Sequence, residues 1–427
     1  MGTGTEVVIS QHAMDCRRAL EALRSGVPNR EAVEMLGSNQ AAAEQVFLKR
    51  LALVASSAHE GKQTPGLLIA GGFGAGKSHL LDYLAHISTA RNFVCSRVVI
   101  SKETQFFDPA KMYVAAMEGA LVPSLSGEAV REIALRLQPN SPQYARFIAW
   151  ANGEESGLSD LFRATIFLYD RLGNDPELVD AITNFWAGER IAISRVRQGL
   201  KQVGAAGLYT PQTVKAKDLA MERFVFASRL IVAAGFSGWV LLVDELELAG
   251  RYSLLQRGRS YAELARWMGR VEGLACPGLL TVGAITDDFA LAVLQEKGDK
   301  ESLGARLREK ATDEFMAMAS RAETGMRIIE REALPLESPG DNVLRETYKK
   351  LKAMHGDAYG WTPPELPAIG ASRTRRLRSY VRRWVNQWDL LRLYPGTALS
   401  VETEEESGPG YAEDTALEHS GEPALCE

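Results

Sequence analysis

Several features that would place a chain in a special class of protein are missing from this sequence. It has no run of about 18 apolar residues, so it offers no membrane-spanning helix. Residues 1–8 lack a basic segment followed by an apolar one, which argues against a secretory signal. The four cysteines form no Cys-x-x-Cys pair and the six histidines show no ligand spacing, which argues against a disulfide framework or a zinc site. We therefore expect a cytoplasmic protein.

Basic residues are absent from one end of the chain. The whole sequence has 49 basic and 54 acidic residues, a formal net charge of −5. Residues 401–427 hold nine of these acids and no lysine or arginine, so the rest of the chain carries a net charge of +4. The segment is also rich in glycine, serine and proline. This composition predicts a disordered tail, with a partner-docking or DNA-mimicking segment as the alternative.

The most specific pattern in the sequence is a glycine-rich stretch at residues 71–78. It reads Gly-Gly-Phe-Gly-Ala-Gly-Lys-Ser and matches the phosphate-binding loop G-x-x-x-x-G-K-[ST]. An apolar run at 66–70 predicts a buried strand before it, and helical apolar spacing follows at 79–87. Glycines at positive φ turn backbone N–H groups toward an anion, and the dipole of the following helix adds to the attraction. A chance glycine-rich turn, the alternative, would not explain the Lys-Ser pair.

The loop is therefore expected to bind Mg²⁺-ATP. Lys77 should reach the β- and γ-phosphates, and the Ser78 hydroxyl should ligate Mg²⁺. The expected nucleotide-binding set in this stretch is Gly71, Gly72, Phe73, Gly74, Ala75, Gly76, Lys77, Ser78 and His79.

A second pattern indicates hydrolysis. The apolar run 239–243 ends in Asp244-Glu245, which is the Walker B pattern. Asp244 is expected to complete the Mg²⁺ shell and Glu245 to polarise the attacking water. A buried strand that happens to end in two acids is the alternative.

A further apolar run at 279–286 ends in Thr286. This is the position of a sensor-1 residue, which contacts the γ-phosphate or the water. Capping of the next helix is the alternative role for Thr286.

The order of these segments predicts an α/β fold, namely an AAA+-like P-loop NTPase with a parallel β-sheet. We expect four parts: an N-terminal helical segment at 1–65, an ATPase core at 66–330, a small helical lid at 331–396 and the acidic tail at 397–427. Residues 121–215 are expected to form a helical insertion, which accounts for the separation of Lys77 and Asp244 by 167 positions. The last strand of the sheet is expected at 326–330.

Arginines cluster on the clearest amphipathic helix of the chain, expected at 372–394. Arg373, Arg375 and Arg376 near its start are candidates for a sensor-2 arginine at the γ-phosphate, and a nucleic-acid surface or a solvated face are the alternatives. The pattern does not support sequence-specific reading of DNA.

An arginine finger supplied by a neighbouring subunit is a further expectation, because such a residue raises turnover by about 10³–10⁵. Arg306, Arg308 and Arg321 lie at suitable positions, and we prefer Arg321. A plain surface arginine is the alternative for each. The role implies a homo-oligomer.

Three segments together resemble the ATP-binding proteins of bacteriophage-exclusion (BREX) defence systems. These are residues 18–30, with Arg-Ser-Gly-Val-Pro at 24–28, the Gly-Lys-Ser-His-Leu-Leu run at 76–81, and Val-Asp-Glu-Leu-Glu at 243–247. The resemblance covers 12–395, and the chain length favours the small, BrxD-like subunit.

The resemblance implies an AAA+-type ATPase, related to the origin-recognition and signal-transducing branches, that acts with methyltransferase and phosphatase-like partners against phage DNA. It also implies that residues 24–28 line the adenine pocket, for which a helix stop and a turn are the alternative. Double-stranded DNA, through the basic surfaces, is a further candidate partner. A non-hydrolysing ATP-dependent scaffold is the second candidate function. A small-molecule kinase is the third and least favoured, because no signature of an acceptor site is visible.

Overall fold

The computed structural model describes residues 10–25, 29–58, 61–125, 127–273, 275–338, 340–367, 377–396 and 410–418. In this part of the chain the strands form a six-stranded sheet in the order β3-β2-β4-β5-β1-β6. Their bounds are β1 Leu67–Ala70, β2 Val94–Val99, β3 Ala120–Leu121, β4 Trp239–Asp244, β5 Leu279–Ile285 and β6 Leu334–Pro335. The predicted α/β class is thus confirmed. None of the helices described is both long and apolar enough to cross a membrane.

The central strands are buried along their whole length. Every residue of β4 and of β5 is buried, and the two strands pair in parallel with Val243 opposite Gly283. Strand β2 pairs with β4 and β6 with β1, also in parallel, while the short β3 is antiparallel to β2. Continuous apolar runs such as these are typical of parallel strands that are covered on both faces.

The prediction of a last strand at 326–330 was wrong. These residues belong to helix α14 (Asp313–Arg331), and the last strand is the two-residue β6. Buried Met318, Ala322 and Met326 recur at spacings of four along α14, so the apolar residues at 326–330 continue a helical face rather than start a strand.

Residue contacts divide the chain into two compact units. Unit 1 comprises Met1–Val46, Ile69–His86 and Leu334–Gly410, and unit 2 comprises Phe47–Leu68, Ile87–Ala333 and Tyr411–Glu427. The four-part division expected from the sequence remains a prediction.

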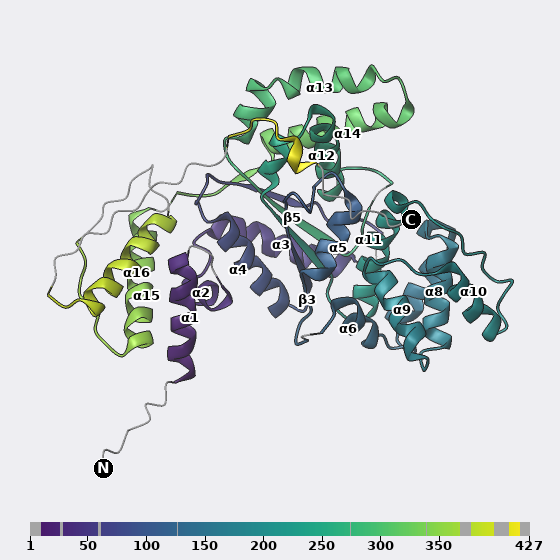
Figure 1. Ribbon diagram of the computed structural model, residues 1–427, viewed down its shortest axis with the longest axis horizontal. Coiled ribbons are helices and arrows are strands. Elements are labelled where there is room, and N and C mark those ends of the chain that lie inside the picture. Colours follow the sequence, from purple (N-terminus) through teal and green to yellow (C-terminus); the bar gives the residue numbers. More distant parts are fainter. Residues whose placement is uncertain are drawn as a thin grey trace, which may run out of the picture. The chain divides into compact units, whose positions relative to one another are not determined.

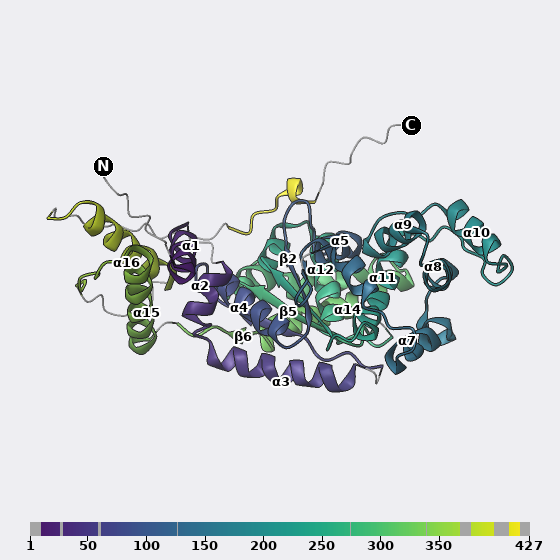
Figure 2. The ribbon, with the colours of Figure 1, turned by 90° about the horizontal axis from the view of Figure 1, so that it is seen from below.

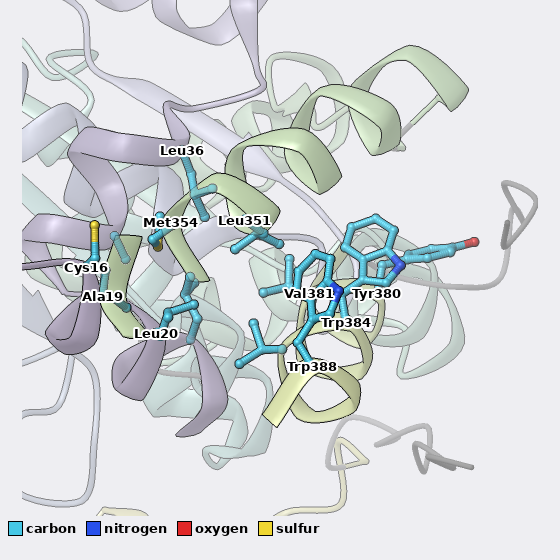
Figure 3. Packing of buried hydrophobic residues seen from close by; sticks show 14 of the residues in the cluster. Cys16, Ala19, Leu20, Leu36, Leu351, Met354, Tyr380, Val381, Trp384 and Trp388 are labelled. Atoms are coloured by element: carbon cyan, nitrogen blue, oxygen red, sulfur yellow. The ribbon is translucent and has the colours of Figure 1, made fainter. Parts of the chain in front are cut away.

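Unit 1 has a helical core built from both ends of the sequence. Its helices lie side by side in Figure 1: α1 Gln11–Ser25, α2 Arg30–Leu36, α15 Asp341–Tyr359 and α16 Leu377–Leu393. Figure 3 shows Leu20 of α1, Leu351 of α15 and Trp388 of α16 among the buried side chains of this cluster. The amphipathic stripe predicted on α16 is the face that packs into the core, because Val381, Trp384 and Trp388 are buried.

A polar network crosses the edge of this core. Arg24 Nε donates to Asp389 Oδ2 at 2.8 Å, and His355 Nε2 lies 3.2 Å from Asp389 Oδ1. The indole N–H of Trp361 donates to His355 Nδ1 at 2.8 Å. Burial opposes the charge on Asp389, but the hydrogen bond from His355 and the charge of Arg24 outweigh it and lower the pKa of Asp389. The resulting stabilisation is present at neutral pH and is lost as the pH falls through that lowered pKa.

Unit 2 surrounds the central strands with helices. Those with bounds inside it are α5 Pro109–Glu118, α6 Ala129–Leu135, α7 Pro142–Asn152, α8 Asp160–Arg171, α9 Pro176–Ala187, α10 Ile193–Gln202, α11 Ala216–Ala233, α12 Leu254–Trp267, α13 Asp299–Arg308 and α14. Helices α3 (Ala41–Ser57) and α4 (Lys77–Ala90) belong to both units. The helical insertion was predicted at 121–215, but Leu121 belongs to β3; the described residues of 122–215 supply helices and no strand. Figure 2 shows α8 and α9 beside α11, where Phe162, Trp186 and Phe226 form an aromatic cluster.

We expect Trp388→Ala to lower the free energy of unfolding by about 3–5 kcal/mol, because truncating a buried tryptophan leaves a cavity. The side chain of Trp388 is fully buried, and its N–H donates to the carbonyl oxygen of Pro364 at 3.0 Å. Leu393→Ala on the same helix is the control, since Leu393 is 56% exposed. Urea denaturation followed by circular dichroism measures both variants, and equal losses would contradict the assignment of this core.

Candidate nucleotide site

The glycine-rich loop joins β1 to α4, and its backbone adopts conformations that favour glycine. Gly74 and Gly76 have φ values of 74° and 97°, and α4 begins at the next residue, Lys77. The loop is closed by a hydrogen bond from Ala75 N to Gly72 O at 3.0 Å. The strand, glycine turn and helix N-terminus predicted from the sequence are therefore present, and this is the arrangement that binds phosphate groups.

Lys77 lies over this loop. It is only 7% exposed, and its Nζ donates to the carbonyl oxygen of Gly71 at 3.0 Å. Gly71 is tightly surrounded, because a Cβ there would come within 3.0 Å of Leu336. The half-buried remainder of the predicted set is Gly72, Phe73, Gly74, Ala75, Gly76 and Ser78. The loop thus places an ammonium group and a serine hydroxyl at the start of one helix, a donor set that fits a metal-bound triphosphate.

His79 has a structural partner that the sequence did not indicate. Its Nε2 lies 2.7 Å from the carbonyl oxygen of Gly37, the residue that ends α2. Burial lowers the pKa of His79, so the ring is neutral and Nε2–H is the donor. The imidazole therefore ties α4 to the end of α2, which leaves the backbone of His79 as the group for the predicted nucleotide contact.

The acidic pair ends strand β4 in unit 2. Asp244 is 2% exposed; its Oδ2 accepts from Arg97 Nη2 at 2.9 Å and its Oδ1 from the backbone N–H of Glu245 at 3.0 Å. Glu245 has a φ of 62°, a left-handed conformation that costs a residue with a side chain about 1–2 kcal/mol. Strained backbone of this kind clusters at functional sites.

Arg97 is a site residue that sequence analysis missed. It lies on β2, and the pairing of β2 with β4 places Val99 opposite Asp244. Arg97 and Asp244 are 147 positions apart in the sequence, so only the register of the two strands brings them together. The one sign of this contact in the sequence was an arginine within a largely apolar strand. Arg97 fixes one oxygen of the Asp244 carboxylate, which is predicted to bind Mg²⁺.

Thr286 directly follows β5, at the same edge of the sheet as Asp244, because β4 and β5 are parallel neighbours. Its Oγ1 lies 2.5 Å from the hydroxyl of Tyr411, and that hydroxyl also contacts Asp288 Oδ1 at 2.9 Å. A disordered tail was expected here, whereas residues 410–418 are described and several of them contact other parts of unit 2.

The predicted arginines have different outcomes. Arg373, Arg375 and Arg376 lie outside the described residues, as do Gly26 to Pro28 of the predicted adenine-pocket segment. The side chain of Arg24, at the start of that segment, is held by Asp389 at 2.7 Å.

The finger candidates lie on α13 and α14. Arg308 pairs with Glu323 at 2.6 Å, and Arg306 is exposed. Arg321 is half-buried within α14, where its Nε donates to the carbonyl oxygen of Ala317 at 3.3 Å. Their catalytic roles remain predictions.

Part of the chain is similar to a known protein family. Residues 12–134 match the family described as BREX system ATP-binding protein BrxC/D. This match confirms the resemblance to BREX ATP-binding proteins and includes the whole glycine-rich loop. It covers less of the chain than the expected 12–395 and does not separate BrxD from BrxC. Searches of curated proteins and of solved structures find no match.

We expect Gly76→Ala to lower the free energy of unfolding by about 1–2 kcal/mol, because an alanine at φ 97° is strained even though no atom lies within 4 Å of its Cβ. The matched control is Gly207→Ala, which also has open space around the Cβ but no positive φ. Urea denaturation of both variants tests this difference. Equal stability of the two alanine variants would show that the loop does not have this backbone conformation.

Proposed function

We propose that this chain, whose residues 12–134 match the BREX ATP-binding family, binds Mg²⁺-ATP at residues 71–79 and hydrolyses it. The observation that carries the proposal is the loop itself, with two glycines at positive φ and a buried lysine at the start of α4. We assign the chain to the AAA+-like P-loop NTPases on this loop and on the acidic pair after a buried parallel strand.

Each of the predicted groups follows the carboxyl end of a strand. The glycine-rich loop follows β1, Thr286 follows β5 and the acidic pair ends β4. Ligands of open α/β sheets bind at the carboxyl ends of the strands. We therefore propose that the loop and the acidic pair act on the same nucleotide.

Each residue has a defined part in the proposed reaction. Lys77 neutralises charge on the β- and γ-phosphates, while Ser78 and Asp244 hold Mg²⁺, which supplies further neutralisation when bound. Glu245 orients and polarises the attacking water, and Thr286 positions the water or the γ-phosphate. Arg97 holds Asp244 in place through its 2.9 Å contact.

The wider role follows from the family. We propose that ATP binding and hydrolysis couple to the assembly or DNA-related action of other phage-defence proteins in the cytoplasm. In a homo-oligomer, Arg321 is the proposed finger for a neighbouring subunit, with Arg373 or Arg376 as sensor 2. Basic surfaces are the proposed contact with double-stranded DNA.

We expect Lys77→Ala to abolish ATP binding, because the ammonium group is the one side-chain cation in the loop. Isothermal titration calorimetry measures the affinity, with Lys62→Ala as the control at an exposed lysine before β1. An unchanged affinity in the Lys77 variant would refute the site.

We expect Glu245→Gln to keep ATP binding but to lose about 10²–10⁴ in turnover, because the amide cannot polarise the water as a carboxylate does. Steady-state phosphate release, with and without DNA, measures this loss. The alternative function, a non-hydrolysing ATP-dependent scaffold, gains if the wild-type protein binds ATP but shows no turnover under any condition.

A further inference from the structure

An acidic segment near the end of the sequence is docked against the other parts of unit 2. It comprises residues 411–418, including the 3₁₀ turn η4 (Thr415–Leu417), and is drawn in yellow beside α12 in Figure 1. The segment contacts two stretches that follow the central strands. One runs from η2 (Leu246–Arg251) into the start of α12, directly after the acidic pair, and the other is 286–289, directly after β5.

Tyr411 is the aromatic anchor of this segment. Its hydroxyl bridges Thr286 Oγ1 and Asp288 Oδ1, and its ring packs edge-on against Phe289 with centroids 5.6 Å apart. Gly250 leaves room for the ring, because a Cβ there would lie 2.7 Å from it. Burial raises the pKa of Tyr411, so the hydroxyl keeps its proton.

Three acids of the segment face a complementary surface. Glu413 pairs with Arg257 at 2.7 Å and Asp414 with Arg251 at 2.8 Å. The carboxylate of Glu418 accepts from the backbone N–H and the hydroxyl of Ser253. The hydrogen bond from Arg257 lowers the pKa of Glu413.

The backbone of the segment is bound as well as its side chains. The N–H of Asp414 donates to the carbonyl oxygen of Arg251 at 2.9 Å, and the carbonyl oxygen of Leu417 accepts from Gln105 Nε2 at 3.2 Å. Aromatic, acidic and backbone groups thus all have partners in one stretch of eight residues. Such a set of contacts is specific for this sequence rather than for negative charge in general.

We propose that Arg251, Ser253, Arg257 and Thr286 form a binding site for an acidic segment with an aromatic anchor, and that its occupant is residues 411–418 of the same chain. The inference rests on the proposed function, because it assigns Thr286 and Glu245 to ATP hydrolysis. The docked segment forms a hydrogen bond with the Thr286 hydroxyl and contacts the stretch that follows Glu245. Residues 411–418 are therefore an autoinhibitory latch that lowers ATP turnover until it is released.

The chemistry of the contacts suits a latch that opens. Glu413 is 54% exposed and Asp414 35% exposed in their side chains, so solvent and salt reach both carboxylates and screen their pairs with Arg257 and Arg251. Arg257 does not depend on the segment, because it is also paired with the buried Asp299 at 2.7 Å. Release therefore leaves this arginine with a partner.

The test compares full-length wild type with Tyr411→Ala, Tyr411→Phe and the double variant Glu413→Gln/Asp414→Asn. The control is Glu272→Gln/Glu296→Gln, which removes the same charge at two exposed positions of unit 2. Hydrogen exchange at the amides of 411–418 reports docking without reference to ATP. We expect protection in the wild type and the control, and its loss in the alanine and double variants. Tyr411→Phe should keep partial protection, because it retains the ring.

ATP turnover is the second measurement. We expect it to rise about 5-fold or more in the variants that lose protection, as is typical of coupled sites. Unprotected amides in the wild type would overturn the binding site. Protection that appears only at high protein concentration would assign the occupant to a second copy. Release of the segment with unchanged turnover would make it a structural strap. Failure of the proposed function would appear separately, as ATP affinity that does not depend on Lys77.

Discussion

The proposed nucleotide site depends on the turn between β1 and α4, where the backbone must close tightly around an ammonium group. Two of its glycines have positive φ, and the buried Lys77 is held by a carbonyl oxygen of the same turn. A lysine that is almost fully buried needs such a partner, because an unpaired buried charge is costly. A strand on one side and a helix on the other fix the ends of the turn. Its rigidity is what gives the loop a defined set of donors.

The second half of the proposed site follows from the sheet. A buried parallel strand delivers Asp244 to its carboxyl end, and the strained backbone of Glu245 turns the chain into η2. The docked segment 411–418 is attached to that same η2 stretch and to Thr286. The unit 2 residues proposed for hydrolysis and the segment proposed to regulate them therefore lie at one edge of unit 2. Residues 411–418 thereby have a proposed regulatory function, and their docked state is closer to the docking alternative than to the disordered tail that the composition favoured.

Much of this could be predicted from the sequence, and the reasons for the rest are physical. Local patterns were sufficient for the α/β class, the glycine loop and the apolar stripe on α16. Arg97 could not be found, because its contact with Asp244 depends on strand register over 147 residues. The segment at 411–418 was expected to be disordered because of its composition. Its docking could not be predicted, because its acids find their partners only in the folded unit 2. The last strand was misplaced because a short apolar run fits a helix face as well as a strand.

The most direct test of the central claim is an experimental structure of the protein with Mg²⁺ and a non-hydrolysable ATP analogue. We predict that the triphosphate lies against the backbone amides of residues 71–78, with Lys77 Nζ moved from Gly71 O to the phosphates. A nucleotide bound elsewhere, or a loop left empty at saturating analogue, would contradict it.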